Sequence, residues 1–259
     1  MTADLVLYNV SERIATITIN RPEKRNALNE ALVKALTDAF ISASEDDEVK
    51  IIVLAANGST FSAGADLAYL QNLQNNSYEE NLADSENLKR LFTTIYYLPK
   101  IVIAQVEGHA IAGGCGLAIV CDLVFSVPEA KFGYTEVKLG FVPAIVACFL
   151  VRKTGETLAK RLLMTAELIS AEQALHYGLI TFVVDGDSIT DSVRNFALNI
   201  CTEASANSLM VTKQLIGQTT NPMLDKSLDF AVQINARVRD SDDFKRGVAA
   251  FLNKEQINW

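Results

Sequence analysis

The sequence has 259 residues, of which 49% are apolar and 21% are charged, the balance of an ordinary globular protein. Its formal net charge is −8 and it has no basic cluster, which argues against nucleic acid as a partner because phosphate contacts need a concentrated positive face. There is no run of about 18 apolar residues and no amino-terminal basic segment followed by a long apolar one. We therefore expect a cytoplasmic protein without a membrane partner.

Residues 1–106 alternate strand-like apolar runs with helical patterns. We expect strands at 15–19, 50–55 and 101–106, and helices at 29–44 and 79–98. Strands that alternate with helices imply right-handed crossovers. The fold class is therefore α/β, with a layered parallel core.

The rest of the chain becomes increasingly helical. A glycine-led turn into a buried helix is expected at 113–124, and a strand followed by a turn at 130–139. Further helices are predicted at 170–177, 188–204, 208–218 and 225–238. We divide the chain into a core of residues 1–195 and a helical region, residues 196–259, that carries subunit contacts.

Two loops of small residues follow predicted strands. The first is Phe61–Leu67, where small residues let backbone N–H groups approach a ligand, although a simple turn with Asp66 capping the next helix is an alternative. The second is Gly108–Leu117, which opens an apolar helix. N–H groups at a helix start stabilise a developing oxyanion, whereas the alternative is close helix packing.

One carboxylate, Glu136, lies among apolar and aromatic residues in the segment Phe132–Pro143. Burial would raise its pKa into the range of a general acid or base. The alternative is an exposed carboxylate paired with Lys138. The two histidines, His109 and His176, lack ligand-spaced partners, so no metal site is expected.

The segments Ile17–Leu28, the two loops and Asp243–Leu252 together resemble the crotonase (enoyl-CoA hydratase/isomerase) superfamily. The resemblance implies a ClpP/crotonase-like fold of repeated ββα units in two nearly perpendicular sheets, followed by a C-terminal helical trimerisation region. It also implies an acyl-CoA substrate, a homotrimer or homohexamer, and no cofactor other than the coenzyme A carried by the substrate. The N–H groups of Ala65 and Gly113 would form the oxyanion hole, with Glu136 as the catalytic acid or base. Residues of the expected coenzyme A site are Lys24, Arg25, Ala27, Leu28, Ala63, Gly64, Asp66 and Leu67.

The sequence departs from the well-known hydratases of this family at Gly116, where they carry a first glutamate. A single glutamate suits a Δ3,Δ2-enoyl-CoA isomerase. The stretches Gly113–Ala118 and Thr135–Ala144, however, resemble a bacterial branch assigned as methylglutaconyl-CoA hydratases of leucine degradation. We therefore expect an enoyl-CoA hydratase-type lyase, with the isomerase as an alternative and a non-catalytic acyl-CoA-binding protein as an alternative of another class.

Overall fold

The computed structural model describes residues 4–220, 223–257 and 259, and it contains two sheets. The large sheet has the order β1-β2-β3-β5-β7-β10 and the small sheet the order β4-β6-β8-β9. The strands of the large sheet are β1 (Val6–Ser11), β2 (Ile14–Ile19), β3 (Ile51–Ala56), β5 (Ile101–Val106), β7 (Leu123–Ser126) and β10 (Phe182–Val183). Those of the small sheet are β4 (Thr60–Ser62), β6 (His109–Ile111), β8 (Lys131–Gly133) and β9 (Leu168–Ser170).

The chain repeatedly places one strand in each sheet before it enters a helix. The repeats are β3–β4–α2, β5–β6–α4 and β7–β8–α5, the last with a short 3-10 helix, η2, before α5. Most neighbouring strands are parallel, as predicted, but β1 with β2 and β8 with β9 are antiparallel. The expected ββα units are therefore present, and the predicted parallel core carries one antiparallel pair at the edge of each sheet.

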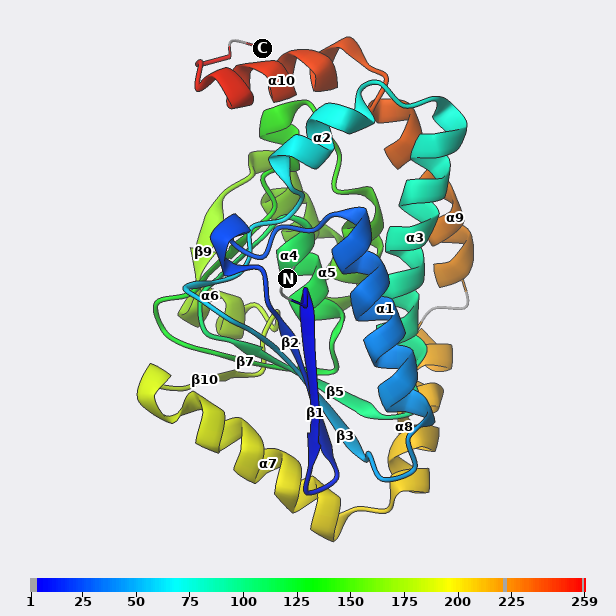
Figure 1. The fold of residues 1–259 in the computed structure, drawn as a ribbon, viewed down its shortest axis with the longest axis vertical. Helices are drawn as coiled ribbons and strands as arrows, with labels where there is room; N and C mark the ends of the chain where they lie inside the picture. Colours follow the sequence, from blue (N-terminus) through cyan, green and yellow to red (C-terminus); the bar gives the residue numbers. More distant parts are fainter. Residues whose placement is uncertain (1–3, 221–222, 258) are drawn as a thin grey trace.

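Ten α-helices and three short 3-10 helices cover the sheets in the described part of the chain. They are α1 (Glu30–Glu45), α2 (Leu67–Leu73), α3 (Tyr78–Tyr97), α4 (Gly113–Val120), α5 (Ala144–Thr165), α6 (Ala171–His176), α7 (Ile189–Glu203), α8 (Ala206–Thr220), α9 (Leu224–Val238) and α10 (Asp242–Asn253), with η1 (Pro22–Lys24), η2 (Glu136–Leu139) and η3 (Gly186–Ser188). Helices α1, α3 and α9 lie side by side along one flank, and α10 lies across α2 (Figure 1). No helix in the described residues has the length and apolar character needed to cross a membrane.

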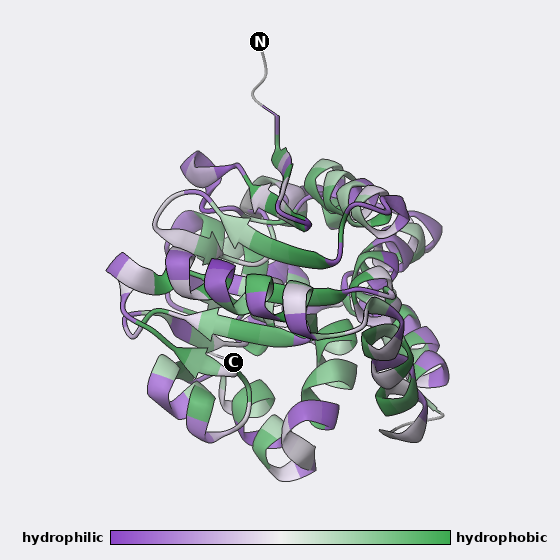
Figure 2. Cartoon of the chain, turned by 90° about the horizontal axis from the view of Figure 1, so that it is seen from below, coloured by the Kyte–Doolittle hydropathy of each residue, from purple (hydrophilic) through white to green (hydrophobic). Residues whose placement is uncertain are grey.

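The main core lies between the large sheet and its helices. Strand β3 is buried along almost its whole length, which is why its sequence is a continuous apolar run rather than an alternating one. The strands are hydrophobic, whereas the covering helices carry hydrophilic residues on their outer sides (Figure 2). A second, smaller cluster of buried residues joins α2 to α10 and contains Leu70, Leu73, Phe244 and Val248.

One predicted boundary differs from the structure. The helix expected over 113–124 ends at Val120, and β7 begins at Leu123. Between them, the Asp122 carboxylate accepts from the Val102 N–H (2.8 Å) and the Asp122 N–H donates to the Val102 carbonyl (2.9 Å), which ties this turn to β5. The division after residue 195 falls inside α7, and it stays a prediction.

Candidate active site

The first glycine-containing loop and the segment after η1 are joined by backbone hydrogen bonds. The Leu28 N–H donates to the Gly64 carbonyl (2.6 Å), and the Asp66 N–H donates to the Leu28 carbonyl (2.9 Å). The Ala63 N–H donates to the Arg25 carbonyl (3.0 Å). These bonds bring residues of the predicted coenzyme A site onto the edge of the small sheet.

Gly64 allows the first loop to touch the second. Its φ is +86°, a conformation that L side chains rarely adopt. A Cβ at this position would lie 2.8 Å from the Ala112 Cβ and 3.6 Å from the Gly113 backbone nitrogen. The structure therefore brings together the two segments for which the sequence predicted oxyanion contacts.

The backbone N–H groups of Ala65 and Gly113 are not used in the hydrogen bonds that their neighbours make. The bridge to Leu28 uses the Gly64 carbonyl and the Asp66 N–H, so the Ala65 N–H is directed to the other side of the segment. Gly113 is the first residue of α4, and the first N–H groups of a helix have no partner within that helix. Ala65 and Gly113 both line a cavity of about 160 Å³.

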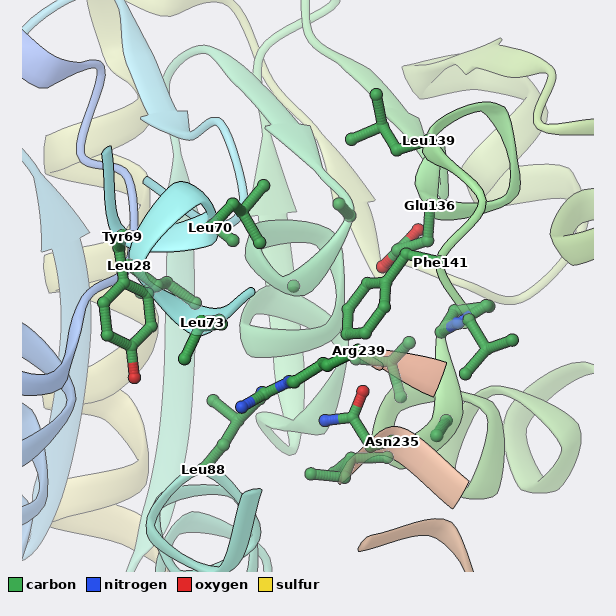
Figure 3. A pocket seen from close by; sticks show the side chains of 18 of the residues that line it. Leu28, Tyr69, Leu70, Leu73, Leu88, Glu136, Leu139, Phe141, Asn235 and Arg239 are labelled. Atoms are coloured by element: carbon green, nitrogen blue, oxygen red, sulfur yellow. The ribbon is translucent and has the colours of Figure 1, made fainter. Parts of the chain in front are cut away.

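Glu136 lines the same cavity from the start of η2 (Figure 3). The residue is 8% exposed, and its Oε2 has no hydrogen-bond partner among the described residues. Burial raises the pKa of this carboxyl to about 7, opposed by a weaker backbone hydrogen bond. The expected burial is confirmed. Lys138, the partner in the alternative interpretation, donates to the Ala166 carbonyl (2.9 Å).

The backbone of η2 is held in place by α10. Gly140 ends η2 with a φ of +65°, and a Cβ there would overlap the Asp243 carbonyl oxygen and lie 2.8 Å from the Phe244 nitrogen. The Phe141 N–H donates to the Glu136 carbonyl (3.1 Å). Close packing of Gly140 against α10 thus fixes the position of the Glu136 backbone in the cavity wall.

The remaining wall is mostly apolar and comes from distant parts of the chain. Its other described residues are Leu28, Asn29, Val33, Ala63, Tyr69, Leu70, Leu73, Asp84, Leu88, Ala112, Thr135, Leu139, Phe141, Val142, Pro143, Ala144, Ile145, Val146, Asn235, Arg239 and Phe251. An apolar cavity with a few polar groups is the usual form of a small-molecule site. Sequence reasoning missed Asp84, Asn235 and Arg239; the only signal was the i, i+4 spacing of the last two.

The predicted coenzyme A residues fall into two groups. Ala63, like Leu28, lines the cavity, and Ala27 and Gly64 are buried beside it. Lys24 and Arg25 are exposed on and after η1 and do not line it. Their contact with coenzyme A stays a prediction.

Asp66 has the capping role that the sequence offered as an alternative. Its Oδ1 accepts from the N–H groups of Ala68 (2.8 Å) and Tyr69 (3.2 Å), and its Oδ2 pairs with Arg21 (2.6 Å). The cap is confirmed, whereas a contact between Asp66 and coenzyme A stays a prediction. Leu67 begins α2, and its side chain lies outside what the structure describes.

Gly116 has no room for a side chain. A Cβ there would overlap the Val146 Cγ1 and lie 3.0 Å from the Phe92 Cε1. Val146 from α5 and Phe92 from α3 therefore fill the position where a second carboxyl group would have to stand. Any second acid must come from another element.

His109 and Asp122 make structural hydrogen bonds. The Nδ1 of His109 accepts from the Lys131 N–H (3.2 Å), and Asp122 pairs with Lys213 (2.7 Å). Within residues 4–220, 223–257 and 259, no three His, Cys, Asp or Glu side chains form a group that could hold a metal ion.

Comparison with known proteins gives matches over nearly the whole chain. A family model described as "Enoyl-CoA hydratase/isomerase" matches residues 9–259. A Thermus thermophilus protein assigned as an enoyl-CoA hydratase is 39% identical over 241 residues, which cover 93% of this chain and 95% of that protein. The 2,3-dehydroadipyl-CoA hydratase of Escherichia coli is 32% identical over 255 residues, which cover 96% of each. The solved structure of an enoyl-CoA hydratase from Mycobacterium avium is 32% identical, covers 100% of both chains and has a TM-score of 0.87, which confirms the predicted fold.

Proposed function

The chain belongs to the enoyl-CoA hydratase/isomerase family, and on that premise we propose that it adds water to a 2-enoyl-CoA thioester with Glu136 as the proton-transfer group. Membership makes the chain an enzyme that acts on acyl-CoA thioesters. The observation that carries the proposal is the buried carboxyl of Glu136, which lines one cavity with the backbone of Ala65 and Gly113.

A pKa of about 7 suits a carboxyl group that must both accept and return a proton near neutral pH. Ionised Glu136 takes a proton from water while the water oxygen bonds to C3. The π electrons of the C2=C3 bond move onto the thioester oxygen, where the N–H groups of Ala65 and Gly113 donate to the new charge. Glu136 then returns the proton to C2, and the thioester carbonyl re-forms.

For the acyl group we propose the branched 3-methylglutaconyl thioester. Support comes from the resemblance of Gly113–Ala118 and Thr135–Ala144 to the bacterial branch that hydrates this compound in leucine degradation. The filled space at Gly116 is consistent with a hydratase that does not use the usual first glutamate.

Mass spectrometry of the products tests the reaction. The protein and its Glu136→Gln variant are incubated with 3-methylglutaconyl-CoA and with straight-chain 2-enoyl- and 3-enoyl-CoA esters. We expect gain of one water by the wild type and a 10²- to 10⁴-fold loss of rate in the variant. Glu129→Gln, an exposed matched substitution, should leave the rate unchanged. Esters that come back unaltered from the wild type would favour the non-catalytic acyl-CoA-binding alternative.

The Δ3,Δ2-enoyl-CoA isomerase is the second candidate, and the filled position at Gly116 favours it. An isomerase needs one carboxylate to take a proton from C2 and return it to C4. Among the described residues of the cavity wall the acids are Asp84 and Glu136, and Asp84 is paired with Arg239. An isobaric product with a moved double bond, formed without gain of water, would establish this reaction.

We further propose that residues 196–259 assemble the protein as a homotrimer or a homohexamer. Exposed apolar side chains on and beside α8 and α9 support this proposal, namely Val211, Leu215, Ile216, Met223 and Phe230. The cytoplasmic location also remains a proposal.

A further inference from the structure

One part of the cavity wall is polar, and it is built from helices that carry none of the predicted catalytic residues. Asp84 comes from α3, Asn235 from α9, and Arg239 directly follows α9. All three line the cavity, and Figure 3 shows Asn235 and Arg239 next to one another below Phe141. Asn235 and Arg239 are each only 3% exposed.

Among the described residues, the ion pair and the hydrogen bonds of the Arg239 guanidinium group all use Nη1. Its Nη1 lies 2.6 Å from the Asp84 Oδ2 and 3.4 Å from the carbonyl oxygen and Oδ1 of Asn81. The Tyr69 hydroxyl also donates to Asp84, and the Arg239 Cζ lies 5.9 Å from the centre of the Phe141 ring. The buried Nε, by contrast, has no hydrogen-bond partner in the described part of the chain.

Asn235 presents a second such atom. Its Nδ2 donates to the Ser85 Oγ (3.1 Å), whereas its buried Oδ1 has no partner among the residues that the structure describes. A buried polar atom without a partner destabilises a protein, and native proteins rarely keep one without a reason. Here two occur on adjacent side chains in the wall of a substrate cavity.

We propose that Arg239 and Asn235 form a subsite for a carboxyl group on the far end of the acyl chain, so that the preferred thioesters are ω-carboxylated. The inference rests on the proposed function, because it takes this cavity as the acyl site. One carboxyl oxygen accepts from the Arg239 Nε–H, and the other meets the Asn235 amide. A guanidinium group offers five N–H donors in a planar fork, so it can hold Asp84 and a second carboxylate together.

The amide of Asn235 can serve either protonation state of the ligand. The Ser85 hydroxyl both donates and accepts, so Asn235 can turn its NH₂ toward a carboxylate or its oxygen toward a neutral carboxylic acid. Asp84 keeps the guanidinium in position and balances its charge before the ligand arrives. A plain alkyl end would leave the Arg239 Nε and the Asn235 Oδ1 desolvated and without partners, and this penalty produces the specificity.

Calorimetric binding of saturated thioesters tests the subsite without any reaction. Glutaryl-CoA is compared with pentanoyl-CoA, and adipyl-CoA with hexanoyl-CoA, so that each pair has the same number of acyl carbons. We expect the carboxylated member of at least one pair to bind ten or more times more tightly. Equal or tighter binding of the alkyl member in both pairs would overturn the proposal.

Two variants assign the preference to these residues. Asn235→Asp keeps the shape and adds a negative charge, and Arg239→Lys keeps the positive charge but removes the Nε–H. Each should reduce the preference for the carboxylated thioester at least tenfold, with melting temperature measured alongside. Asn199→Asp, which adds the same charge on the exposed face of α7, should keep the preference. If both variants weaken the two members of a pair equally, the residues are only structural and the subsite is refuted.

The binding and turnover experiments can contradict the subsite and the proposed reaction independently of one another. A preference for glutaryl-CoA in a protein that transforms no enoyl-CoA ester would contradict the proposed reaction and support the subsite. Hydration of enoyl-CoA esters without any carboxyl preference would support the reaction and contradict the subsite.

Discussion

The Glu136 carboxyl couples the stability of the protein to pH as well as serving the proposed reaction. Burial raises its pKa from 4.5 to about 7, so the folded protein holds this proton more tightly than the unfolded chain does. The resulting stabilisation is fully present below about pH 4.5 and is lost as the pH rises through 7. Since one pKa unit corresponds to about 1.4 kcal/mol, the difference amounts to roughly 3 kcal/mol.

We therefore expect Glu136→Gln to raise the free energy of unfolding at pH 8.5 by up to roughly 3 kcal/mol, because the variant buries no charge. Most of this gain should disappear at pH 5, where the wild-type carboxyl is neutral in the folded protein. Urea denaturation of both proteins at the two pH values measures the difference. Equal stabilities at pH 8.5 would show that the carboxylate is well solvated and that its pKa is not raised.

The sequence predicted a site residue when the cause of its burial lay in neighbouring residues of the chain. Glu136 has apolar and aromatic neighbours in the chain, and its burial followed from them. Arg239 and Asp84 are separated by more than 150 residues, so their pairing depends on the packing of α9 against α3. No local pattern could have shown that these two residues share a cavity with Glu136.

At the level of elements, the close approach of α4 and α5 depends on Gly116. Two effects oppose one another in Gly116→Ala: alanine favours a helix over glycine by about 1 kcal/mol, whereas overpacking against Val146 costs about 1–3 kcal/mol. We expect overpacking to win, with a net loss of about 1 kcal/mol in the free energy of unfolding. In a Val146→Ala background the overlap with Cγ1 is removed, although the Phe92 Cε1 and the Val146 Cβ stay 3.0 Å away, so the same substitution should cost less.

A double-mutant cycle of Gly116→Ala and Val146→Ala, measured by chemical denaturation, gives this coupling directly. We expect a coupling energy of about 1 kcal/mol or more in favour of the double variant. Strictly additive effects would mean that α4 and α5 do not meet at this point.

Elements were predictable when they were long and regular. The expected strands over 50–55 and 101–106 correspond closely to β3 and β5. The strands of the small sheet have three residues each, too few to show a period of two. Helix α5 was missed, and its pattern is interrupted at Gly155, where φ is 75° and ψ is 168°.

At the scale of the whole molecule, the C-terminal helices expose several large apolar side chains. Leu215 and Ile216 on α8 are 59% and 57% exposed, and Phe230 on α9 is 66% exposed. Large apolar side chains that face solvent can mark a site of protein association. They lie within residues 196–259, for which the sequence predicts subunit contacts.

We expect the protein to form a trimer of about 85 kDa in solution, three times the chain mass of 28.3 kDa, or a hexamer of twice that mass. Replacing Leu215 and Ile216 together with lysine should break the assembly, because burying two added charges in an apolar interface costs several kcal/mol. Light scattering after size-exclusion chromatography measures both masses. Leu7→Lys, on the exposed edge strand β1, is the control and should leave the mass unchanged. A wild-type mass of one chain would contradict the proposed assembly. A double variant that stays assembled would place the subunit contact on another surface.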